Sequence, residues 1–216
     1  MTTVAIDGPA GAGKSTVARL VADALGFEYL DTGAMYRAVA LAALQRGVDP
    51  SDGAALGRLA ASLDLDVGER VTLDGRDVTA AIRTEEVSRA VSEIAAHPEV
   101  RESLAARQRT FAGAHDVVME GRDIGTSVTP RAEVKVFLTA SAEERARRRG
   151  RQLGLARDSA ALEEVRRAIQ ERDRSDAGRA ASPFARAPDA LIVDSTGRSA
   201  RDVAREIVAR VREVVG

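Results

Sequence analysis

Residues 8–15 of the chain have the types and spacing of a phosphate-binding loop. Their sequence, GPAGAGKS, matches the pattern G-x-x-x-x-G-K-[ST], whose glycines let backbone N–H groups turn inward around a phosphate. Lys14 would bring a cation to the β- and γ-phosphates, and Ser15 would offer its hydroxyl to Mg²⁺ at the start of a helix. An apolar segment over residues 3–6 precedes the loop, and a helical pattern over residues 15–25 follows it. This arrangement predicts a site for a nucleoside triphosphate.

A phosphate-binding loop does not by itself name an activity, but the rest of the chain narrows the choice. A regulatory GTPase also needs an N-K-x-D segment that recognises guanine, and the sequence contains none. A large motor or transporter ATPase needs a longer chain than these 216 residues. The loop is therefore best explained by a small kinase that transfers a γ-phosphoryl group to a second small molecule.

The segment LDTGAMYR, residues 30–37, is a candidate for part of the acceptor site. It lies where the second predicted strand ends, and ligands of open α/β sheets bind at the carboxyl ends of strands. Asp31 or Thr32 could cap the following helix, with Tyr36 and Arg37 one turn further along. A plain helix cap with a surface arginine explains the same residues about equally well, because Asp and Thr are common caps.

The segment EGRD, residues 120–123, directly follows a predicted buried strand over residues 117–119. Gly121 permits close approach of a ligand to the backbone. Arg122 could bind a phosphate, and Asp123 could accept a hydrogen bond from a sugar or a base. A glycine-containing turn with a local ion pair is the alternative for this segment.

Arginine is so common in this chain that a single arginine says little about function. Only Lys14 and Lys135 are lysine, so 30 of the 32 basic residues are arginine. Residues 82–109 carry several arginines beside Ser92, and exposed helix faces account for them well. The lysine of the loop is the more informative cation.

Residues 145–179 contain eleven arginines and six acidic residues, a local excess of positive charge in a nearly neutral chain. A lid that closes on the triphosphate fits this excess, because its arginines would stabilise the charge of the transferred group. RNA is a second candidate, but Phe184 is the one aromatic residue near this segment, so base stacking would be poor. Solvated helices with ion pairs such as Glu144–Arg148 explain about half of these arginines.

Strands and helices alternate along the chain, which predicts an α/β fold with a mainly parallel sheet covered on both faces. Two regions interrupt this alternation and are interpreted as insertions. One contains a small hairpin around the turn signal Asp74–Gly75, and the other is the arginine-rich region. The five core strands are predicted at residues 3–6, 27–30, 117–119, 134–138 and 190–193, and helices at 15–25, 32–44, 51–63, 85–94, 99–111, 162–173, and from 141 and 199 onward.

The composition excludes several other classes of protein. Cysteine is absent, which removes disulfides, iron–sulfur clusters and cysteine zinc sites, and the two histidines form no metal-ligand pattern. The net charge of −1 gives no overall attraction to nucleic acid or membrane. The sequence shows neither a signal peptide nor an apolar run long enough to span a bilayer. We expect a cytoplasmic, monomeric enzyme with no nucleic acid or membrane partner.

These segments together resemble the bacterial cytidylate kinase family nearly end to end. The resemblance rests on the stretches IDGPAGAGKST, LDTGAMYRA, DGRDVTAAIRTEEVSRAVS, VRESLAARQR, VMEGRDIGT, ERDRSDAGRAASP and DALIVDST. The loop is shared by many kinases, whereas DVTAAIRTEEVS within a long insertion distinguishes this family from adenylate, shikimate and dephospho-coenzyme A kinases. The connection over residues 150–159 is short for the family, which bears on the geometry of the lid.

The resemblance implies a fold and a reaction. The fold is a single P-loop NTPase-type domain with a three-layer α/β core of about five parallel strands. Its expected parts are a core over residues 1–31, 112–140 and 186–216, a nucleoside-monophosphate-binding region over 32–111, and an arginine-rich helical lid over 141–185. The reaction is transfer of the γ-phosphoryl group of ATP to CMP or dCMP, with Mg²⁺ as cofactor.

The resemblance also implies the site residues. Lys14, Arg122, Arg148 and Arg179 are expected to be catalytic, and Ser15 is the expected Mg²⁺ ligand, together with phosphates and water. The expected ATP-binding residues are Gly8, Pro9, Ala10, Gly11, Ala12, Gly13, Lys14, Ser15 and Thr16. The expected CMP-binding residues are Thr32, Gly33, Tyr36, Arg37, Ser92, Arg101, Arg122, Asp123, Arg172, Asp176 and Arg179.

Among the CMP-binding residues, the resemblance places Ser92, Arg101 and Asp123 around the cytosine, and Arg172 and Asp176 at the ribose. It implies that Arg37, Arg122 and Arg179 bind the phosphates and that Tyr36 packs beside the acceptor.

The alternatives come from different classes of protein. One is another P-loop small-molecule kinase, with UMP or a non-nucleotide as acceptor, and the other is an RNA-binding ATPase that uses the arginines of residues 145–179. An acceptor screen separates them, because a cytidylate kinase releases ADP rapidly only with CMP or dCMP.

Overall fold

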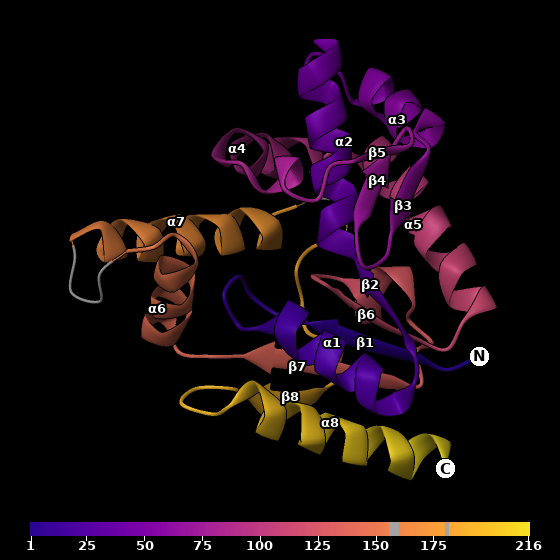
Figure 1. Cartoon of the computed structure of the whole chain (residues 1–216), viewed down its shortest axis with the longest axis vertical. Helices are drawn as coiled ribbons and strands as arrows, with labels where there is room; N and C mark the ends of the chain where they lie inside the picture. The colour runs from indigo at the N-terminus through magenta and orange to yellow at the C-terminus, as the bar shows by residue number, and fades with distance from the viewer. Residues whose placement is uncertain (156–159, 180–181) are drawn as a thin grey trace. The chain divides into compact units, whose positions relative to one another are not determined.

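The computed structural model describes residues 1–155, 160–179 and 182–216 (Figure 1). It divides into two compact units. The core unit comprises Met1–Tyr29 and His115–Gly216, and the inserted unit comprises Leu30–Ala114. Among the residues of the predicted lid, Arg157 lies outside the described part of the chain.

The main sheet has five strands in the order β2-β6-β1-β7-β8, as the alternation of strands and helices predicts. Its strands are β1 (Thr3–Asp7), β2 (Glu28–Asp31), β6 (Val117–Gly121), β7 (Val134–Thr139) and β8 (Leu191–Asp194). Strand β1 pairs in parallel with both β6 and β7, and β7 pairs in parallel with β8. The carboxyl ends of β1 and β6 therefore lie side by side, which brings the phosphate-binding loop next to residues 120–123.

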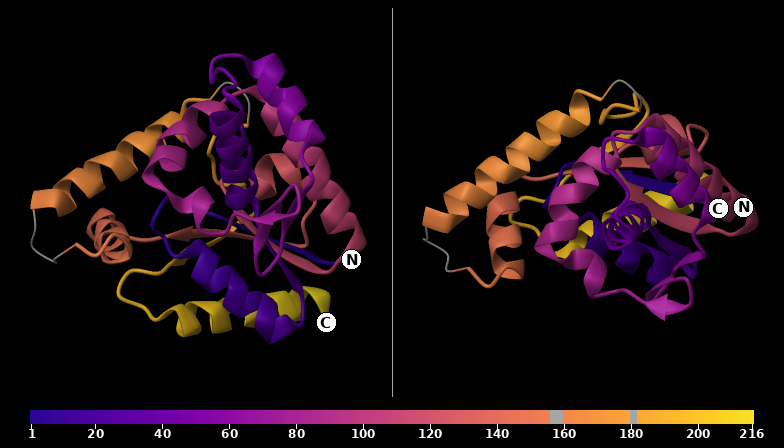
Figure 2. Two further views of the ribbon diagram at one scale, coloured as in Figure 1. Left: turned by 45° about the horizontal axis from the view of Figure 1, so that its top comes forward. Right: turned by 90° about the horizontal axis from the view of Figure 1, so that it is seen from above.

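One face of this sheet is covered by the first and last helices, α1 (Lys14–Leu25) and α8 (Ala200–Val215), which lie together in Figures 1 and 2. Every residue of β1 is buried, as expected for a central strand covered on both faces. Val4 and Ile6 of this strand pack in one cluster with Val17 of α1 and Ile207 of α8. This core fixes the strand from which the phosphate-binding loop leaves.

The inserted unit combines helices with a second, smaller sheet. Its helices are α2 (Thr32–Arg46), α3 (Gly53–Ser62), α4 (Glu85–Ile94) and α5 (Pro98–Ala114), with a short 3₁₀ turn η1 (Ala81–Arg83). The sheet is antiparallel, with strands β3 (Leu65–Val67), β4 (Val71–Leu73) and β5 (Arg76–Asp77).

The hairpin predicted around Asp74–Gly75 is present between β4 and β5. Both turn residues have positive φ, 50° for Asp74 and 75° for Gly75, as the type I′ hairpin turn requires. The sequence predicted two strands here, and the structure adds a third because β3 pairs with the other edge of β4.

Two further helices, α6 (Ala142–Gln152) and α7 (Ala160–Ala177), form the arginine-rich region of the core unit. Helix α6 begins at the predicted position, where Ser141 caps it by accepting a hydrogen bond from the backbone N–H of Glu144. The carboxylate of Glu144 pairs with Arg147 and Arg148. A short π-helix, η2 (Ile124–Val128), follows the EGRD segment and was not predicted. Within the described ranges, no helix is long and apolar enough to cross a membrane.

Candidate active site

The phosphate-binding loop leaves β1 and ends at the first residue of α1, as predicted. Gly13 caps the helix with a φ of 93°, a conformation that side chains rarely adopt. Gly8 lies so close to β7 that an added Cβ would be 2.0 Å from the carbonyl oxygen of Leu138. Both glycines are thus required by the path of the loop, and the N-terminus of α1 adds a dipole that favours a bound anion.

Lys14 is the first residue of α1, and its side chain folds back along the loop. Its Nζ donates a hydrogen bond of 3.1 Å to the carbonyl of Pro9. Burial, followed by the neighbouring charge of Arg122, lowers the pKa of Lys14 from 10.5 to about 8. The neighbouring carboxylates of Glu120 and Asp7 act in the opposite direction, and a bound phosphate would add to their effect because an anion favours the charged amine.

Ser15 and Glu120 together supply oxygen ligands at the base of the loop. The Ser15 hydroxyl donates to Oε1 of Glu120 over 2.5 Å, and the Tyr29 hydroxyl lies 3.5 Å from the same oxygen. Glu120 is the penultimate residue of β6 and is buried. In the described parts of the chain, no group of three acidic or histidine side chains could hold a metal. The Ser15 hydroxyl and the Glu120 carboxylate fit Mg²⁺, which usually takes one or two protein oxygens plus phosphates and water.

Arg122, which follows β6, is held from several sides over the loop. One nitrogen, Nη1, donates to the carbonyl of Gly8 at 3.3 Å and to Oδ1 of Asp173 at 2.8 Å. The other, Nη2, lies 3.0 Å from Oδ2 of Asp176. The guanidinium also lies over the ring of Phe184, 5.1 Å from its centre. This arrangement fixes the cation beside the loop before any ligand binds.

Helix α7 brings acidic and basic side chains of the predicted site together. Asp176 is 1% exposed and pairs with Arg122 and with Arg179. Arg172 lies close enough to Lys14 for its charge to lower the pKa of the lysine. Asp173, which had no predicted role, contacts the loop itself by accepting from the backbone N–H of Ala10.

Arg148, predicted to be catalytic, has its guanidinium bonded to protein groups in this structure. Its nitrogen atoms donate to Glu144, to the carbonyl of Ala12, and to both the hydroxyl and the carbonyl of Ser195. Ser195 follows β8 and is 2% exposed, and its hydroxyl lies 3.0 Å from the carbonyl of Ala12 and 2.9 Å from that of Thr139, either of which can accept its proton. Helix α6 is thereby tied to the loop and to the turn before α8.

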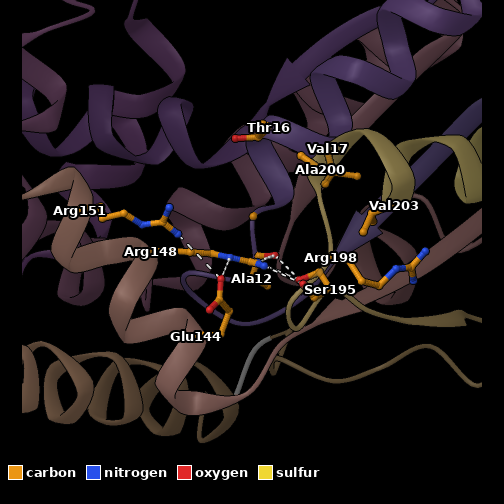
Figure 3. Close-up of a pocket in the computed structure, with 11 residues that line it drawn as sticks. Ala12, Thr16, Val17, Glu144, Arg148, Arg151, Ser195, Arg198, Ala200 and Val203 are labelled. Atoms are coloured by element: carbon orange, nitrogen blue, oxygen red, sulfur yellow. Dashed lines mark hydrogen bonds and ion pairs between the residues drawn. The ribbon is translucent and has the colours of Figure 1, made fainter. Parts of the chain in front are cut away.

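A pocket of about 350 Å³ opens beside this network, between α6, the start of α1 and the start of α8. Figure 3 shows Arg148 and Glu144 on α6 turned toward Ser195 and Ala12, with Thr16 and Val17 of α1 on another side. The pocket is adjacent to the phosphate-binding loop because Ala12, Gly13 and Thr16 line it.

Asp7 and Asp123 are buried acids at the ends of β1 and β6. The carboxylate of Asp7 accepts hydrogen bonds of 2.8 Å from the backbone N–H groups of Ile124 and Gly125. Burial raises its pKa from 3.8 to about 6, despite these two bonds, and the nearby charge of Asp123 acts in the same direction. Asp7 thus holds the turn that carries Asp123.

The raised pKa of Asp7 predicts how stability changes with pH. The folded protein binds the proton of Asp7 more tightly than the unfolded chain does, so the contribution of Asp7 to stability falls as pH rises from about 4 to about 6. Over this range the shift corresponds to roughly 3 kcal/mol. Urea unfolding of the wild type and of Asp7→Asn at several pH values should show the wild type gaining stability relative to the variant as pH falls. Parallel curves would contradict the prediction.

The inserted unit holds the remaining predicted residues, and it groups several of them around Asp31. Asp31 caps α2 by accepting from the backbone N–H of Ala34 at 2.9 Å, so the cap was predicted correctly. Arg37 of α2 and Arg83 each place a guanidinium nitrogen 3.9 Å from Oδ2 of Asp31. An atom added at Gly33 would lie 3.7 Å from the nitrogens of Arg37. Arg37 Nη1 is buried without a hydrogen-bond partner among the described residues, which leaves a donor for an anionic ligand.

Arg101 and Tyr36 also meet within the inserted unit. The guanidinium of Arg101 lies 5.5 Å from the centre of the Tyr36 ring and donates to the carbonyl of Ala95 at 3.2 Å. Arg101 is 6% exposed, so the interpretation as an exposed surface arginine is wrong for this residue. Ser92 lies on α4, directly before the segment that Arg101 anchors.

The structure thus gathers the predicted residues into two groups. In the core unit, the loop residues lie with Arg122, Asp123, Arg172, Asp176 and Arg179. In the inserted unit, Thr32, Gly33, Tyr36 and Arg37 lie on α2, with Ser92 on α4 and Arg101 on α5. Sequence reasoning gave no role to Glu120, Arg145, Asp173 or Ser195. The spacing of Asp173 and Asp176, three residues apart on one helix face, was the available signal.

Comparisons with known proteins agree over nearly the whole chain. The sequence model of a family described as "Cytidylate kinase" matches residues 4–213. The chain is 54% identical over 214 residues to a cytidylate kinase of Pelotomaculum thermopropionicum, covering 96% of this chain and 95% of that protein. It is 51% identical over 218 residues to a cytidylate kinase of Shouchella clausii, covering 97% and 96%.

Among solved structures, an uncharacterized protein from Eubacterium ventriosum has a similar fold. The TM-score is 0.55 and the sequence identity 9%, over 98% of this chain and 99% of that one. The structural likeness supports the α/β fold, and the sequence matches support the resemblance inferred from the motifs. The chain belongs to the cytidylate kinase family.

Proposed function

We propose that this protein transfers the γ-phosphoryl group of ATP to CMP or dCMP, giving ADP and CDP or dCDP. A phosphate oxygen of the acceptor forms a bond to the γ-phosphorus while the bond from that phosphorus to the leaving oxygen of ADP breaks. The observation that carries the proposal is the juxtaposition of Lys14 with Arg122 over the phosphate-binding loop, within a chain that matches cytidylate kinases along its length.

Phosphoryl transfer requires mainly that the two substrates be positioned and that the charge of the transferred group be stabilised. The transferred group carries negative charge throughout, and the acceptor is already an anionic oxygen, so no strong protein base is needed. Lys14 and Arg122 would stabilise this charge, with Arg179 held near Arg122 by Asp176. Their protein partners limit how far these cations must rearrange when substrate binds.

Mg²⁺ would bind at Ser15, with Glu120 positioned to accept from its water ligands or to bind it directly. When bound, the metal would neutralise part of the charge of the phosphates. The Ser15–Glu120 contact supports this assignment because both oxygens lie at the helix start that follows the loop.

The pocket lined by Arg148 and Ser195 is the proposed site for the base and ribose of ATP. It is contiguous with the loop residues Gly13 and Thr16, as the remainder of a nucleoside triphosphate requires. In this proposal, Arg148 holds the wall of the pocket through Ala12 and Ser195 while keeping its charge near the phosphates.

Residues that could contact the acceptor are proposed in each unit, taken separately. The Asp123 carboxylate would accept from the exocyclic amine of cytosine, the same pairing by which Asp and Glu recognise cytosine N4. Within the inserted unit, Tyr36, Ser92 and Arg101 are proposed acceptor contacts, supported by the packing of Arg101 on Tyr36. Arg37 would bind the acceptor phosphate through its buried nitrogen.

We also propose the roles of the two predicted sub-regions, the cellular location and the oligomeric state. Residues 32–111 would be the nucleoside-monophosphate-binding region and residues 141–185 the lid. The enzyme would act in the cytoplasm as a monomer, and its balanced charge favours small-molecule partners over nucleic acid. Light scattering on the purified protein tests the oligomeric state.

Asp123→Ala should raise the KM for CMP by about 10-fold or more and change the KM for ATP much less. The physical reason is the loss of a buried acceptor that faces the cytosine amine, which costs about 1.5–3 kcal/mol for a hydrogen bond to a charged group. Steady-state kinetics with each substrate varied in turn provides the measurement. Equal small changes in both KM values would remove Asp123 from the acceptor site.

An acceptor screen tests the function as a whole. ADP release by the wild type should be rapid with CMP or dCMP and much slower with UMP, shikimate or no acceptor. ADP release that is stimulated by RNA and indifferent to CMP would reject the proposal.

A further inference from the structure

The carboxylate of Asp173 lies among groups that bind phosphate. It is carried by α7 and reaches the phosphate-binding loop, where Oδ1 accepts from the backbone N–H of Ala10 at 3.1 Å. The same oxygen accepts from Nη1 of Arg122 at 2.8 Å. The second oxygen, Oδ2, accepts from Nη1 of Arg145 at 2.5 Å. One acid therefore connects the loop to a cation on each side.

The two arginines use the same pattern of contacts. Arg122 divides Nη1 between Asp173 and the carbonyl of Gly8, and Arg145 divides Nη1 between Asp173 and the carbonyl of Ala10. The carbonyl acceptors are two residues apart in the loop. Each guanidinium is thus fixed by two acceptors, one on the loop backbone and one on α7.

Burial makes these contacts energetically significant. The side chains of Arg122, Asp173 and Arg145 are 15%, 16% and 12% exposed, so the charges are poorly screened by water. Two arginines this close would repel each other without an anion between them. Asp173 supplies that anion, and its two oxygens set the spacing of the two guanidinium groups.

Packing around Asp173 and its two arginines also restricts Arg145. Gly11 of the loop lies against α6, where an added Cβ would be 2.8 Å from the carbonyl oxygen of Arg145. The backbone of Arg145 is therefore in contact with the loop, and its side chain needs only to turn toward Asp173. Arg122 is supported in addition by Phe184, whose ring stacks on Phe137 at 5.7 Å.

We propose that Asp173 is a positioning residue for phosphoryl transfer, which holds Arg122 and Arg145 at the two sides of the loop so that both face the transferred group. Asp173 keeps these contacts when ATP is bound, and Arg145 joins Arg122 as a cation that stabilises the transition state. The inference deepens the proposed kinase function and rests on it. It gives a role to an acid and an arginine that the motifs left unassigned.

The main alternative is that Asp173 is a competitor of phosphate. An anion at the Ala10 N–H could occupy part of the triphosphate site in the free enzyme and leave it when ATP binds. The two roles make opposite predictions. A positioning residue is needed for turnover, whereas a competitor lowers the affinity for ATP and can be removed without loss of turnover.

The test is steady-state kinetics of Asp173→Asn with ATP and CMP, beside the wild type. Asparagine keeps the shape but removes the charge, so the arginines lose their shared anion. We expect kcat to fall about 10- to 100-fold, because small misplacements of stabilising groups have effects of this size. The KM for ATP should change less than about 3-fold, since the lost interaction acts mainly in the transition state.

Arg145→Met provides a second variant that does not depend on the folding of the first. It should show the same signature of lowered kcat with little change in KM. The double variant should lose less than the product of the two single effects, because Asp173 acts partly through Arg145. Glu163→Gln is the matched control, since Glu163 is an exposed acid on the same helix paired with Arg166, and its kcat should equal that of the wild type.

The outcomes distinguish a failure of the proposed kinase function from a failure of the positioning role of Asp173. A wild type without CMP-dependent ADP release would reject the proposed function itself. The positioning role would be overturned if the wild type is active and Asp173→Asn has the same kcat but a lower KM for ATP. That result would favour the role of Asp173 as a competitor of phosphate. Equal kcat and KM in the wild type, Asp173→Asn and Arg145→Met would also overturn it.

Discussion

Replacing Lys14 with alanine should lower kcat about 1,000-fold while leaving the fold intact. Lys14 donates to the loop backbone at the carbonyl of Pro9, and removal of one preorganised group that stabilises transition-state charge has effects of this size. Steady-state kinetics with ATP and CMP gives the measurement. Lys135→Ala is the matched control, because this other lysine of the chain pairs with Asp189 and should show wild-type turnover.

Lys14→Ala should be at least as stable as the wild type. The pKa of Lys14 is lowered to about 8 in the folded protein, so holding its charge opposes folding below that pH, and this cost is relieved as pH rises from about 8 to about 10.5. Urea unfolding at pH 7 measures the difference. A large loss of stability in Lys14→Ala would show that the lysine supports the fold, and near-wild-type turnover would contradict its catalytic role.

Arg122→Met should lower both turnover and stability. Turnover should fall about 100- to 1,000-fold, because the variant removes a cation held over the loop. The free energy of unfolding should fall by roughly 2–3 kcal/mol, since Asp173 and Asp176 lose a buried partner. Kinetics and urea unfolding together measure the two effects.

Arg166→Met is the control for Arg122→Met. Arg166 also pairs with an acid on α7, but this pair is largely exposed and contributes little to stability. Its turnover and unfolding free energy should match the wild type. Loss of turnover in Arg122→Met without loss of stability would show that the buried acids do not depend on this arginine.

Local signals in the sequence predicted the elements around the loop well. The pattern of residues 8–15, the strand before it and the helix after it are all determined by near neighbours, and each is present. The same holds for the cap at Asp31, whose side chain accepts from the backbone N–H of Ala34 three residues later. Short-range chemistry of this kind can be read without knowing the fold.

Features that depend on contacts between distant residues could not be predicted from the sequence. The residue pattern placed the arginines of residues 82–109 on exposed helix faces, although the resemblance gave Arg101 a role at the cytosine. The pattern could not show the burial of Arg101 because this residue packs on Tyr36, which is 65 positions earlier in the chain. In the arginine-rich region, composition alone could not distinguish Arg145, which reaches Asp173, from Arg166, which pairs with its own helix. Strand β3 was missed because it has only three residues, too few to show a clear alternation.

The two ends of the inserted unit leave and rejoin the core at adjacent points. The backbone N–H of Glu28 donates to the carbonyl of Asp116 at 2.9 Å, so the chain returns beside the place where it departed. The core strands therefore already close the large loop formed by the insertion, and its length adds little further chain entropy to the cost of folding. Insertions of different length and sequence could be exchanged at this point during evolution, and a donor-binding core of this kind could acquire new acceptors without being rebuilt.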